Sequence, residues 1–363
     1  MLFLAGDIGG TKALLQLIAF RPETSERTLL GQNRYLCQDF DSLESIIQTF
    51  LSSLNLSSSF IESACFGLPG PVNGRIVQLT NLPWIVDADQ IEQACSIRKV
   101  SFINDFHAAA LGVPALEPDQ VLPLYMPPLQ EQGAQCKISN HFLVIGAGTG
   151  LGVSPVFYDG VHVHPVASEG GHFDFAPISQ TQQLLLTWLW QQYEHVSYER
   201  VLSGPGLETL YCFFELFDCP TTYSLDDSQN LKKNRLENTQ NNQVGLFIAQ
   251  SLKQSGYPTT PTAAEIYRAA ELNDPIAVKA LTEFVTIYGA FVGASALFWG
   301  ASQGVYLAGG IAIKIFDWIR KPYFHQAYIE KGRMSKIVES RPVYLVSDDT
   351  LGLRGAMQHN LTD

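Results

Sequence analysis

The sequence predicts a protein of two α/β domains that face each other across a cleft. The prediction rests on one scheme that occurs twice along the chain: two apolar runs joined by glycines, followed by alternating strand and helix patterns. The first copy surrounds Gly9-Gly10 near the N-terminus, and the second surrounds Gly146–Gly150. Glycines let backbone N–H groups approach an anion closely, so two such loops are suited to hold one phosphate chain from opposite sides.

The first copy predicts three antiparallel strands followed by helix, strand, helix, strand and helix. Two apolar runs joined by Gly9-Gly10 predict a hairpin with positive φ at the turn. Asp41 or Ser42 is expected to cap the first helix, since both residue types are favoured at that position. The expected strands are 2–7, 13–18, 29–37, 63–67 and 100–103, and the expected helices are 43–54, 91–95 and 106–111.

The second copy follows a stretch rich in Pro and Gln, residues 118–135, which we interpret as a connector. A polar stretch, residues 238–243, is expected to be a surface loop or insertion. The expected strands are 141–145, 151–158, 161–167, 305–308 and 343–346, and the expected helices are 180–193, one opening at 203–206, 262–270, 275–299, one from 311, and 351–360.

Composition and charge narrow the class of protein. The chain has 363 residues, 46% of them hydrophobic and 16% charged, with a formal net charge of −12. This acidity argues against a nucleic-acid or anionic-membrane partner, because phosphate backbones require clustered Lys and Arg. The six cysteines form no Cys-x-x-Cys motif, so zinc-ribbon and redox motifs are absent. We therefore expect a soluble cytoplasmic enzyme.

One uncharged segment, from Phe284 to Ile313, exceeds the roughly 20 residues that a bilayer span requires. Gly300 to Gly304 divides it into a helix-like half and a short strand. Gly289 and Gly293 are spaced for close packing against another helix. We therefore predict core elements in this segment and no membrane span.

The N-terminal stretch Gly6-Asp7-Ile8-Gly9-Gly10-Thr11 combines an acid, two glycines and a hydroxyl at the end of a strand. Asp7 is well placed to hold a hydrated Mg²⁺ that bridges phosphates. A tight turn with a buried aspartate is the structural alternative. Two other phosphate loops fail on spacing: the chain has no Gly-Lys dipeptide for a Walker loop, and Gly146–Leu151 misses the third glycine of the dinucleotide fingerprint.

Asn104-Asp105 lies at the carboxyl end of an apolar strand, where open α/β sheets place ligand sites. A kinase that acts on an alcohol needs a carboxylate to accept the hydroxyl proton, and Asp105 is the candidate for this general base. Asn104 supplies an amide that could bind neighbouring sugar hydroxyls. Helix capping explains both residues equally well when they are considered alone.

A third group of polar residues is Glu169, His172 and Glu199. Carboxylates and an imidazole recognise polyols because they accept and exchange hydrogen bonds. Glu169-x-x-His172 could suggest a metal site, but its two glycines predict a loop and not the helix on which such ligands normally lie. Glu199 taken alone would be a solvated helix acid. His162 and His164 share one face of a strand and are interpreted as structural.

The opening Gly-Asp-Ile-Gly-Gly-Thr motif resembles the phosphate loop of the bacterial glucokinases, in the hexokinase/actin-like ATPase superfamily. Other stretches resemble that family in the same order along the chain. They are Thr80-Asn81-Leu82-Pro83-Trp84, Asn104-Asp105, Gly148-Thr149-Gly150, Ser168-Glu169-Gly170-Gly171-His172, Tyr198-Glu199-Arg200-Val201-Leu202-Ser203-Gly204-Pro205-Gly206 and Leu307-Ala308-Gly309-Gly310-Ile311. The cysteine-rich zinc motif of a related branch is missing, so the resemblance is to the zinc-free glucokinases.

This resemblance implies two ribonuclease-H-like domains: a small one of residues 1–115 plus 347–363, and a large one of residues 116–346. It implies ATP and Mg²⁺, the latter held by Asp7, and a homodimer. Asp105 would be the catalytic base. The sugar would be bound by Asn104, Asp105, Glu169, His172 and Glu199, with Asn81 a weaker candidate. The nucleotide would be bound by Gly6, Asp7, Ile8, Gly9, Gly10, Thr11, Gly148, Thr149, Gly150, Gly309 and Gly310.

The predicted function is therefore that of a glucokinase, which transfers the γ-phosphoryl group of ATP to the 6-hydroxyl of D-glucose in the first step of glycolysis. Two alternatives remain at this point. One is a kinase for another hexose, such as mannose, fructose or an N-acetylhexosamine. The other is a non-catalytic sugar-binding regulator. A DNA-binding regulator would need a basic helix-turn-helix extension, whereas this acidic chain enters its first strand at Leu2.

Overall fold

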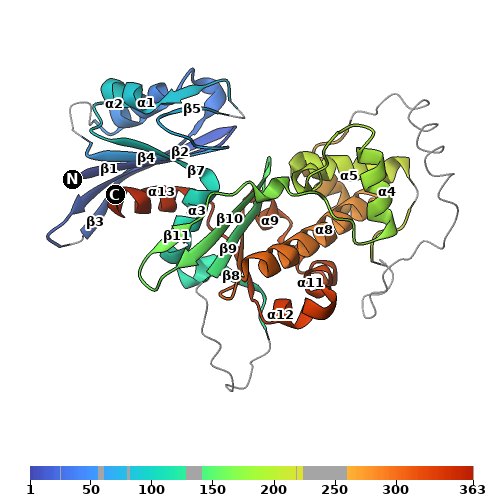
Figure 1. Ribbon diagram of the computed structural model, residues 1–363. Helices are drawn as coiled ribbons and strands as arrows, with labels where there is room; N and C mark the ends of the chain where they lie inside the picture. Colours follow the sequence, from blue (N-terminus) through green and yellow to red (C-terminus); the bar gives the residue numbers. More distant parts are fainter. Residues whose placement is uncertain are drawn as a thin grey trace. The chain divides into compact units, whose positions relative to one another are not determined.

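The computed structural model describes residues 1–24, 26–55, 61–79, 82–127, 141–217, 219–223 and 260–362. Asn81 and the polar stretch 238–243 lie outside the described residues. The chain divides into two compact units, which Figure 1 shows coloured along the sequence. The first unit comprises Met1–Val121, Ser154–Ala167 and Asp348–Asp363, and the second comprises Leu122–Val153 and Ser168–Ser347.

A five-stranded mixed sheet forms the centre of the first unit. Its strands are β1 (Leu2–Ile8), β2 (Lys12–Arg21), β3 (Glu26–Leu36), β4 (Ser63–Leu68) and β7 (Val100–Asn104). They lie in the order β3-β2-β1-β4-β7, with β1, β2 and β3 antiparallel and β1, β4 and β7 parallel. The carboxyl ends of β1, β4 and β7 therefore meet at one edge of the sheet.

Helices cover both faces of this sheet because successive residues of its inner strands are apolar and alternate residues point to opposite faces. Leu4 and Ile8 pack with α1 (Leu43–Ser53) and α2 (Ala88–Cys95), while Phe3 and Ala5 pack with α13 (Leu351–Thr362) and α3 (Asp105–Gly112). Figure 1 shows α1 and α2 on one side of the sheet and α3 and α13 on the other. Of the two residues expected to cap α1, Ser42 does so.

The turn between β1 and β2 differs from the prediction. The Gly9 N–H donates to the Lys12 carbonyl at 2.8 Å, and neither Gly9 nor Gly10 has a positive φ. The expectation of positive φ was wrong because Ile8 pairs with Ala13, which leaves a four-residue loop. Such longer loops do not need the left-handed backbone of a two-residue hairpin turn.

A six-stranded sheet repeats the strand order of the first. Its strands are β8 (Val121–Tyr125), β9 (His141–Ala147), β10 (Leu151–Tyr158), β11 (Val163–Pro165), β12 (Val305–Ala308) and β13 (Val343–Val346). The strands lie in the order β11-β10-β9-β12-β13-β8. Counted along the chain from β9, the first five positions hold the third, second, first, fourth and fifth strands, as in the first sheet. Strand β12 runs parallel to β9 and to β13. The repeated scheme predicted from the sequence is confirmed.

Two features were not predicted. β5 (Ile76–Gln78) and β6 (Ile85–Asp87) pair as a short antiparallel hairpin in the first unit. The expected connector 118–135 contains β8 at the edge of the second sheet, so that interpretation was wrong for its first residues. Both segments have few residues and weak alternation, and pairing with a neighbouring strand decides their structure.

The helices of the second unit surround α8 (Pro275–Trp299), the long apolar helix. The others among the described residues are α4 (Gln180–Leu189), α5 (Gly204–Leu216), α7 (Ala263–Glu271), α9 (Gly310–Lys314), α10 (Phe316–Ile319), α11 (Pro322–Ile329) and α12 (Ser335–Glu339). A Cβ on Gly289 would overlap the Phe324 carbonyl oxygen, and one on Gly293 that of Tyr328, so these glycines admit α11 against α8. The predicted packing face is confirmed.

Helix α8 is the single helix among the described residues that is long and apolar enough to cross a membrane. However, 83% of its apolar window is buried inside the protein. The side chains of Leu281, Phe284 and Val292 are fully buried within the hydrophobic core of the second unit. This burial agrees with the predicted core helix.

Candidate active site

Asp7 ends the apolar part of β1 and points to the sheet face covered by α13. It lies against the start of that helix: a Cβ on Gly352 would be 3.0 Å from the Asp7 carboxylate. Within the described residues, no hydrogen bond reaches this carboxylate. Burial raises the pKa of Asp7 to about 6; the Arg34 guanidinium opposes this shift, and the Asp349 carboxylate adds to it. Asp7 is thus a half-buried acid without a hydrogen-bond partner.

The loop after Asp7 is held by Cys37, which begins the 3₁₀ helix η1 (Cys37–Asp39). The Cys37 N–H donates to the Thr11 carbonyl at 2.9 Å, and the buried thiol lies 3.5 Å from the Gly9 carbonyl. Thr11 itself is exposed. Gly6 and Ile8 are also expected at the nucleotide. Both are buried in the sheet, so they can contact a ligand through backbone groups alone.

Asn104 and Asp105 lie where β7 becomes α3. The Asn104 side-chain oxygen accepts the N–H groups of Phe106 and His107 at 2.9 and 3.1 Å, and its amide donates to the Gly70 carbonyl at 3.0 Å. Asn104 therefore caps α3 and keeps one amide proton for a ligand. Asp105 is half-buried at the same edge as Asp7, and β4 lies between their strands, so the two strand ends are about 10 Å apart.

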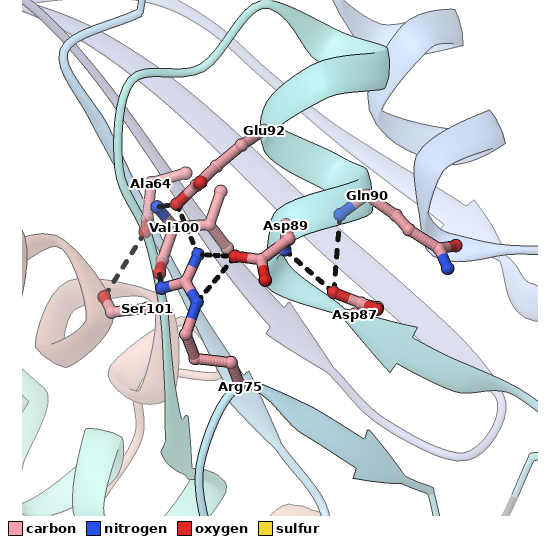
Figure 2. Close-up of polar contacts among 8 residues, drawn as sticks. All are labelled: Ala64, Arg75, Asp87, Asp89, Gln90, Glu92, Val100 and Ser101. Carbon is pink, nitrogen blue, oxygen red and sulfur yellow. Dashed lines mark hydrogen bonds and ion pairs between the residues drawn. The ribbon is translucent and has the colours of Figure 1, made fainter.

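An ion-pair network holds the other end of β7, as Figure 2 shows. The Arg75 guanidinium donates to Asp89 and Glu92 of α2, each at 2.7 Å, and to the Val100 carbonyl at 3.2 Å. Glu92 also accepts the Val100 N–H at 2.8 Å. The strand that carries Asn104 is thereby tied at its start to α2.

Glu199 lies in the second unit, in the 3₁₀ helix η5 (Tyr198–Arg200). Its carboxylate oxygen Oε2 accepts the Leu151 N–H at 2.8 Å, directly after the loop Gly148–Gly150. The other oxygen, Oε1, is 3.8 Å from Nε2 of His172. The structure thus brings together three predicted features: Glu199, His172 and the second glycine loop.

Glu169 and His172 bound the short 3₁₀ helix η4 (Gly170–His172), for which Glu169 is the N-cap residue. Both side chains are exposed, and the Glu169 carboxylate has no hydrogen bond or ion pair among the described residues. A Cβ on Gly171 would overlap the Leu151 carbonyl oxygen, so the glycines seat this turn on the backbone of β10. Glu169 is free to meet a ligand, and the structure does not bring its carboxylate against Glu199.

The glycine pair after β12 lies beside the second glycine loop. Ala308 pairs with Gly146 in the sheet, and Gly309, with φ +87°, would place a Cβ 2.8 Å from the Ala147 carbonyl oxygen. No heavy atom lies within 4 Å of the corresponding position on Gly310. Gly309 thus packs closely against Ala147, the residue before the second glycine loop, and Gly310 leaves an open backbone surface.

Two contributors to this site were missed from the sequence. Gly352 admits Asp7 to the start of α13, and the Leu151 N–H binds Glu199. The spacing Gly352-x-x-Gly355, which repeats at one helical turn, could have indicated close packing of the last helix. A backbone N–H has no sequence signature, so the Leu151 contact required the structure.

The decisive comparison is with known families. A model of the glucokinase family matches residues 4–362. The chain belongs to the glucokinase family. Among curated relatives, the glucokinase of Nostoc punctiforme is 34% identical over 98% of this chain and 97% of its own length. The glucokinase of Synechocystis sp. is 33% identical over 98% and 96%.

Solved glucokinase structures share the fold. The glucokinase of an Antarctic psychrotroph superposes with a TM-score of 0.73 at 26% identity, covering 100% of this chain and 99% of its own. A glucokinase of Streptomyces griseus, solved in complex with glucose and AMPPNP, gives a TM-score of 0.58 at 21% identity over 99% of each chain. The fold is that of the actin-like ATPase sugar kinases, as the sequence predicted.

Proposed function

We propose that the residues described above carry out the glucokinase reaction, each in a separate role. In this reaction the γ-phosphoryl group of ATP is transferred to the 6-hydroxyl of D-glucose, giving glucose 6-phosphate and ADP. The chain is an ATP-dependent hexose kinase, a phosphotransferase with an alcohol acceptor. The observation that supports the assignment of roles is that the polar side chains of the family motifs that the structure describes are exposed or half-buried: Asp7, Asn104, Asp105, Glu169, His172 and Glu199.

Asp105 is proposed as the general base. As the glucose O6 attacks the γ-phosphorus, the new O–P bond forms, the bond to the β,γ-bridging oxygen breaks, and ADP leaves with that electron pair. The hydroxyl proton passes to the Asp105 carboxylate. Asn104 steadies Asp105 by capping α3 and donates its remaining amide proton to a sugar hydroxyl.

Glu169, His172 and Glu199 are proposed to bind the other sugar hydroxyls, with Asn81 as a further contact. The two carboxylates accept hydrogen bonds, and the imidazole can both donate and accept. Three segments are proposed to bind ATP: Gly9 to Thr11, Gly148 to Gly150 and the Gly309-Gly310 pair. They would do so by close approach and through backbone N–H groups other than those of Gly9 and Gly148, which donate within their own loops.

The metal proposed for the reaction is Mg²⁺, and Asp7 fits it. Its carboxylate is half-buried and has no hydrogen-bond partner among the described residues. In that part of the chain, no group of three or more His, Cys, Asp or Glu side chains could hold a metal ion by itself. Mg²⁺ with ATP normally takes one or two carboxylates, waters and phosphate oxygens, so a lone Asp7 suffices. When bound, Mg²⁺ would neutralise charge on the phosphates.

A coupled assay with Mg·ATP and a panel of hexoses tests this proposal. Turnover on glucose far above mannose, fructose and N-acetylglucosamine is expected. Asp105→Asn should lower kcat by about 10²-fold or more, because general-base catalysis contributes that much, while calorimetry still detects glucose binding. Asp41→Asn, an exposed aspartate before α1, is the matched control. Full turnover by Asp105→Asn would remove Asp105 from the base role.

We further propose that the enzyme is a cytoplasmic homodimer. No disulfide links the cysteines of the described residues, which suits a reducing compartment. Light scattering of the purified chain tests the dimer, since a monomeric mass at micromolar concentration would contradict it.

A further inference from the structure

The carboxylate of Glu199 lies between the proposed sugar site and the second glycine loop. Its Oε2 accepts the Leu151 N–H at 2.8 Å, at the end of the second glycine loop, and its Oε1 faces Nε2 of His172. One third of the side chain remains exposed. A single carboxylate of the sugar site is therefore bound to the backbone of the nucleotide loop.

Gly150 makes this contact possible. A Cβ at position 150 would be 2.5 Å from Glu199 Oε2, closer than side chains tolerate. At Gly148, two residues earlier, no heavy atom lies within 4 Å of the same position. The space beside Gly150 is thus filled by the Glu199 carboxylate, whereas the space beside Gly148 is open.

One further hydrogen bond ties the segment of Glu199 to the same loop, and two more hold that segment together. The Ser203 hydroxyl donates to the Glu199 carbonyl at 2.8 Å and accepts the Gly206 N–H at 3.1 Å, capping α5. The Gly204 N–H donates to the Gly148 carbonyl at 2.8 Å. Residues 199–206 therefore contact the glycine loop at both of its ends.

We propose that Glu199 couples the sugar site to the glycine loop, so that glucose and Mg·ATP each strengthen the binding of the other. The inference rests on the proposed function, in which Glu199 binds glucose and the loop binds ATP. A sugar hydroxyl that binds Oε1 fixes the carboxylate, and the fixed carboxylate holds the Leu151 amide and Gly148–Gly150. Less conformational entropy is then lost when the nucleotide orders the loop.

Thermodynamic linkage makes this coupling measurable without turnover. The factor by which glucose lowers the Kd of Mg·AMPPNP must equal the factor by which Mg·AMPPNP lowers the Kd of glucose. Because the factor is a ratio, it stays defined in a variant that binds either ligand more weakly. Titration calorimetry on the full chain gives all four constants.

Gly150→Ala and Gly148→Ala form a matched pair in one loop. We expect a coupling factor of about 5 or more for the wild type, within the usual range for coupled sites. Gly150→Ala should reduce it to within about twofold of 1, because the new methyl group displaces the Glu199 carboxylate from the Leu151 amide. Gly148→Ala should retain the wild-type factor even where nucleotide binding weakens. Glu199→Asp, one methylene shorter, should behave as Gly150→Ala does.

Each outcome of these titrations either supports or overturns the role of Glu199. The role of Glu199 is overturned if the coupling persists in Gly150→Ala and Glu199→Asp, if it is lost equally in Gly148→Ala, or if the wild-type factor is near or below 1. In those cases both ligands still bind, so the proposed function stands. A wild type that binds neither glucose nor Mg·AMPPNP would instead overturn the proposed function itself, and the coupling with it.

Discussion

Among single residues, Asp7 is expected to lower the stability of the fold. Its pKa is raised to about 6, chiefly by burial, so the folded state holds the proton more tightly than the unfolded state does. The ionised form is therefore penalised above pH 6, and the penalty disappears as the pH falls towards 4. Asp7→Asn should raise the free energy of unfolding at pH 7.5 by about 1–3 kcal/mol and lower activity. Thermal melts from pH 4 to 8 measure the gain.

Asp348, whose pKa is lowered and not raised, is the control for Asp7. Burial acts to raise its pKa, but hydrogen bonds from Thr350 and Arg354 outweigh it and lower the pKa below the ordinary value. The stability that Asp348 contributes is present above its unfolded pKa and is lost as the pH falls through its folded one. Asp348→Asn should therefore destabilise at pH 7.5. Equal effects of both substitutions at every pH would contradict the assigned ionisation states.

The role of a residue was predictable where the chemistry of that role requires one residue type. The end of β7 was identified from Asn104-Asp105, and the capping interpretation of Asn104 is confirmed, while its contact with a sugar hydroxyl stays a prediction. The partner of Glu199 was not predictable, since the Leu151 N–H and the space at Gly150 depend on how η5 packs on the loop. Contacts through backbone groups leave no trace in residue types.

At the scale of elements, the packing of α8 on α11 depends on two glycines. Gly289→Ala would drive a methyl group into the Phe324 carbonyl oxygen, and the two helices would have to separate. We expect a loss of about 3 kcal/mol in the free energy of unfolding, because buried overpacking costs that much. Denaturant melts measure it.

The control for this substitution is Gly300→Ala at the C-cap of the same helix, where φ is +67° and no atom lies within 4 Å. It should cost only about 1 kcal/mol, from the left-handed backbone alone. If Gly300→Ala cost as much as Gly289→Ala, the close approach of α11 would not be the cause.

Long elements were predicted well and short ones poorly. The range 275–299 was identified from the uncharged apolar segment that begins at Phe284 and from the break at Gly300; in the structure, Asp274 and Gly300 cap the helix. The hairpin β5–β6 and the strand β8, which contains Pro123, were missed. Strands of three to five residues carry little alternation of their own and form because a neighbour supplies hydrogen bonds.

For the whole molecule, the repeated strand order was predictable because each copy opens with the same pattern of runs and glycines. The distribution of the chain between the units was harder to predict. Ser154–Ala167, from the middle of the sequence, belongs to the first unit, whereas the return of the C-terminal segment to that unit was already expected from the family resemblance. Membership of this kind is decided by contacts between segments far apart in the chain.

The return of α13 to the first unit predicts that its packing stabilises that unit alone. Asn360 of α13 donates to the Leu4 carbonyl of β1 at 2.7 Å, and a Cβ on Gly355 would overlap the Ala108 carbonyl oxygen of α3. Gly355→Ala should therefore speed hydrogen exchange in peptides from β1, β4 and α3, while α8 and β12 keep wild-type protection. Gly310→Ala, which faces open space in the second unit, should leave exchange in both units unchanged. Equal loss of protection in both units would mean that they unfold as one cooperative body, with α13 supporting the whole chain.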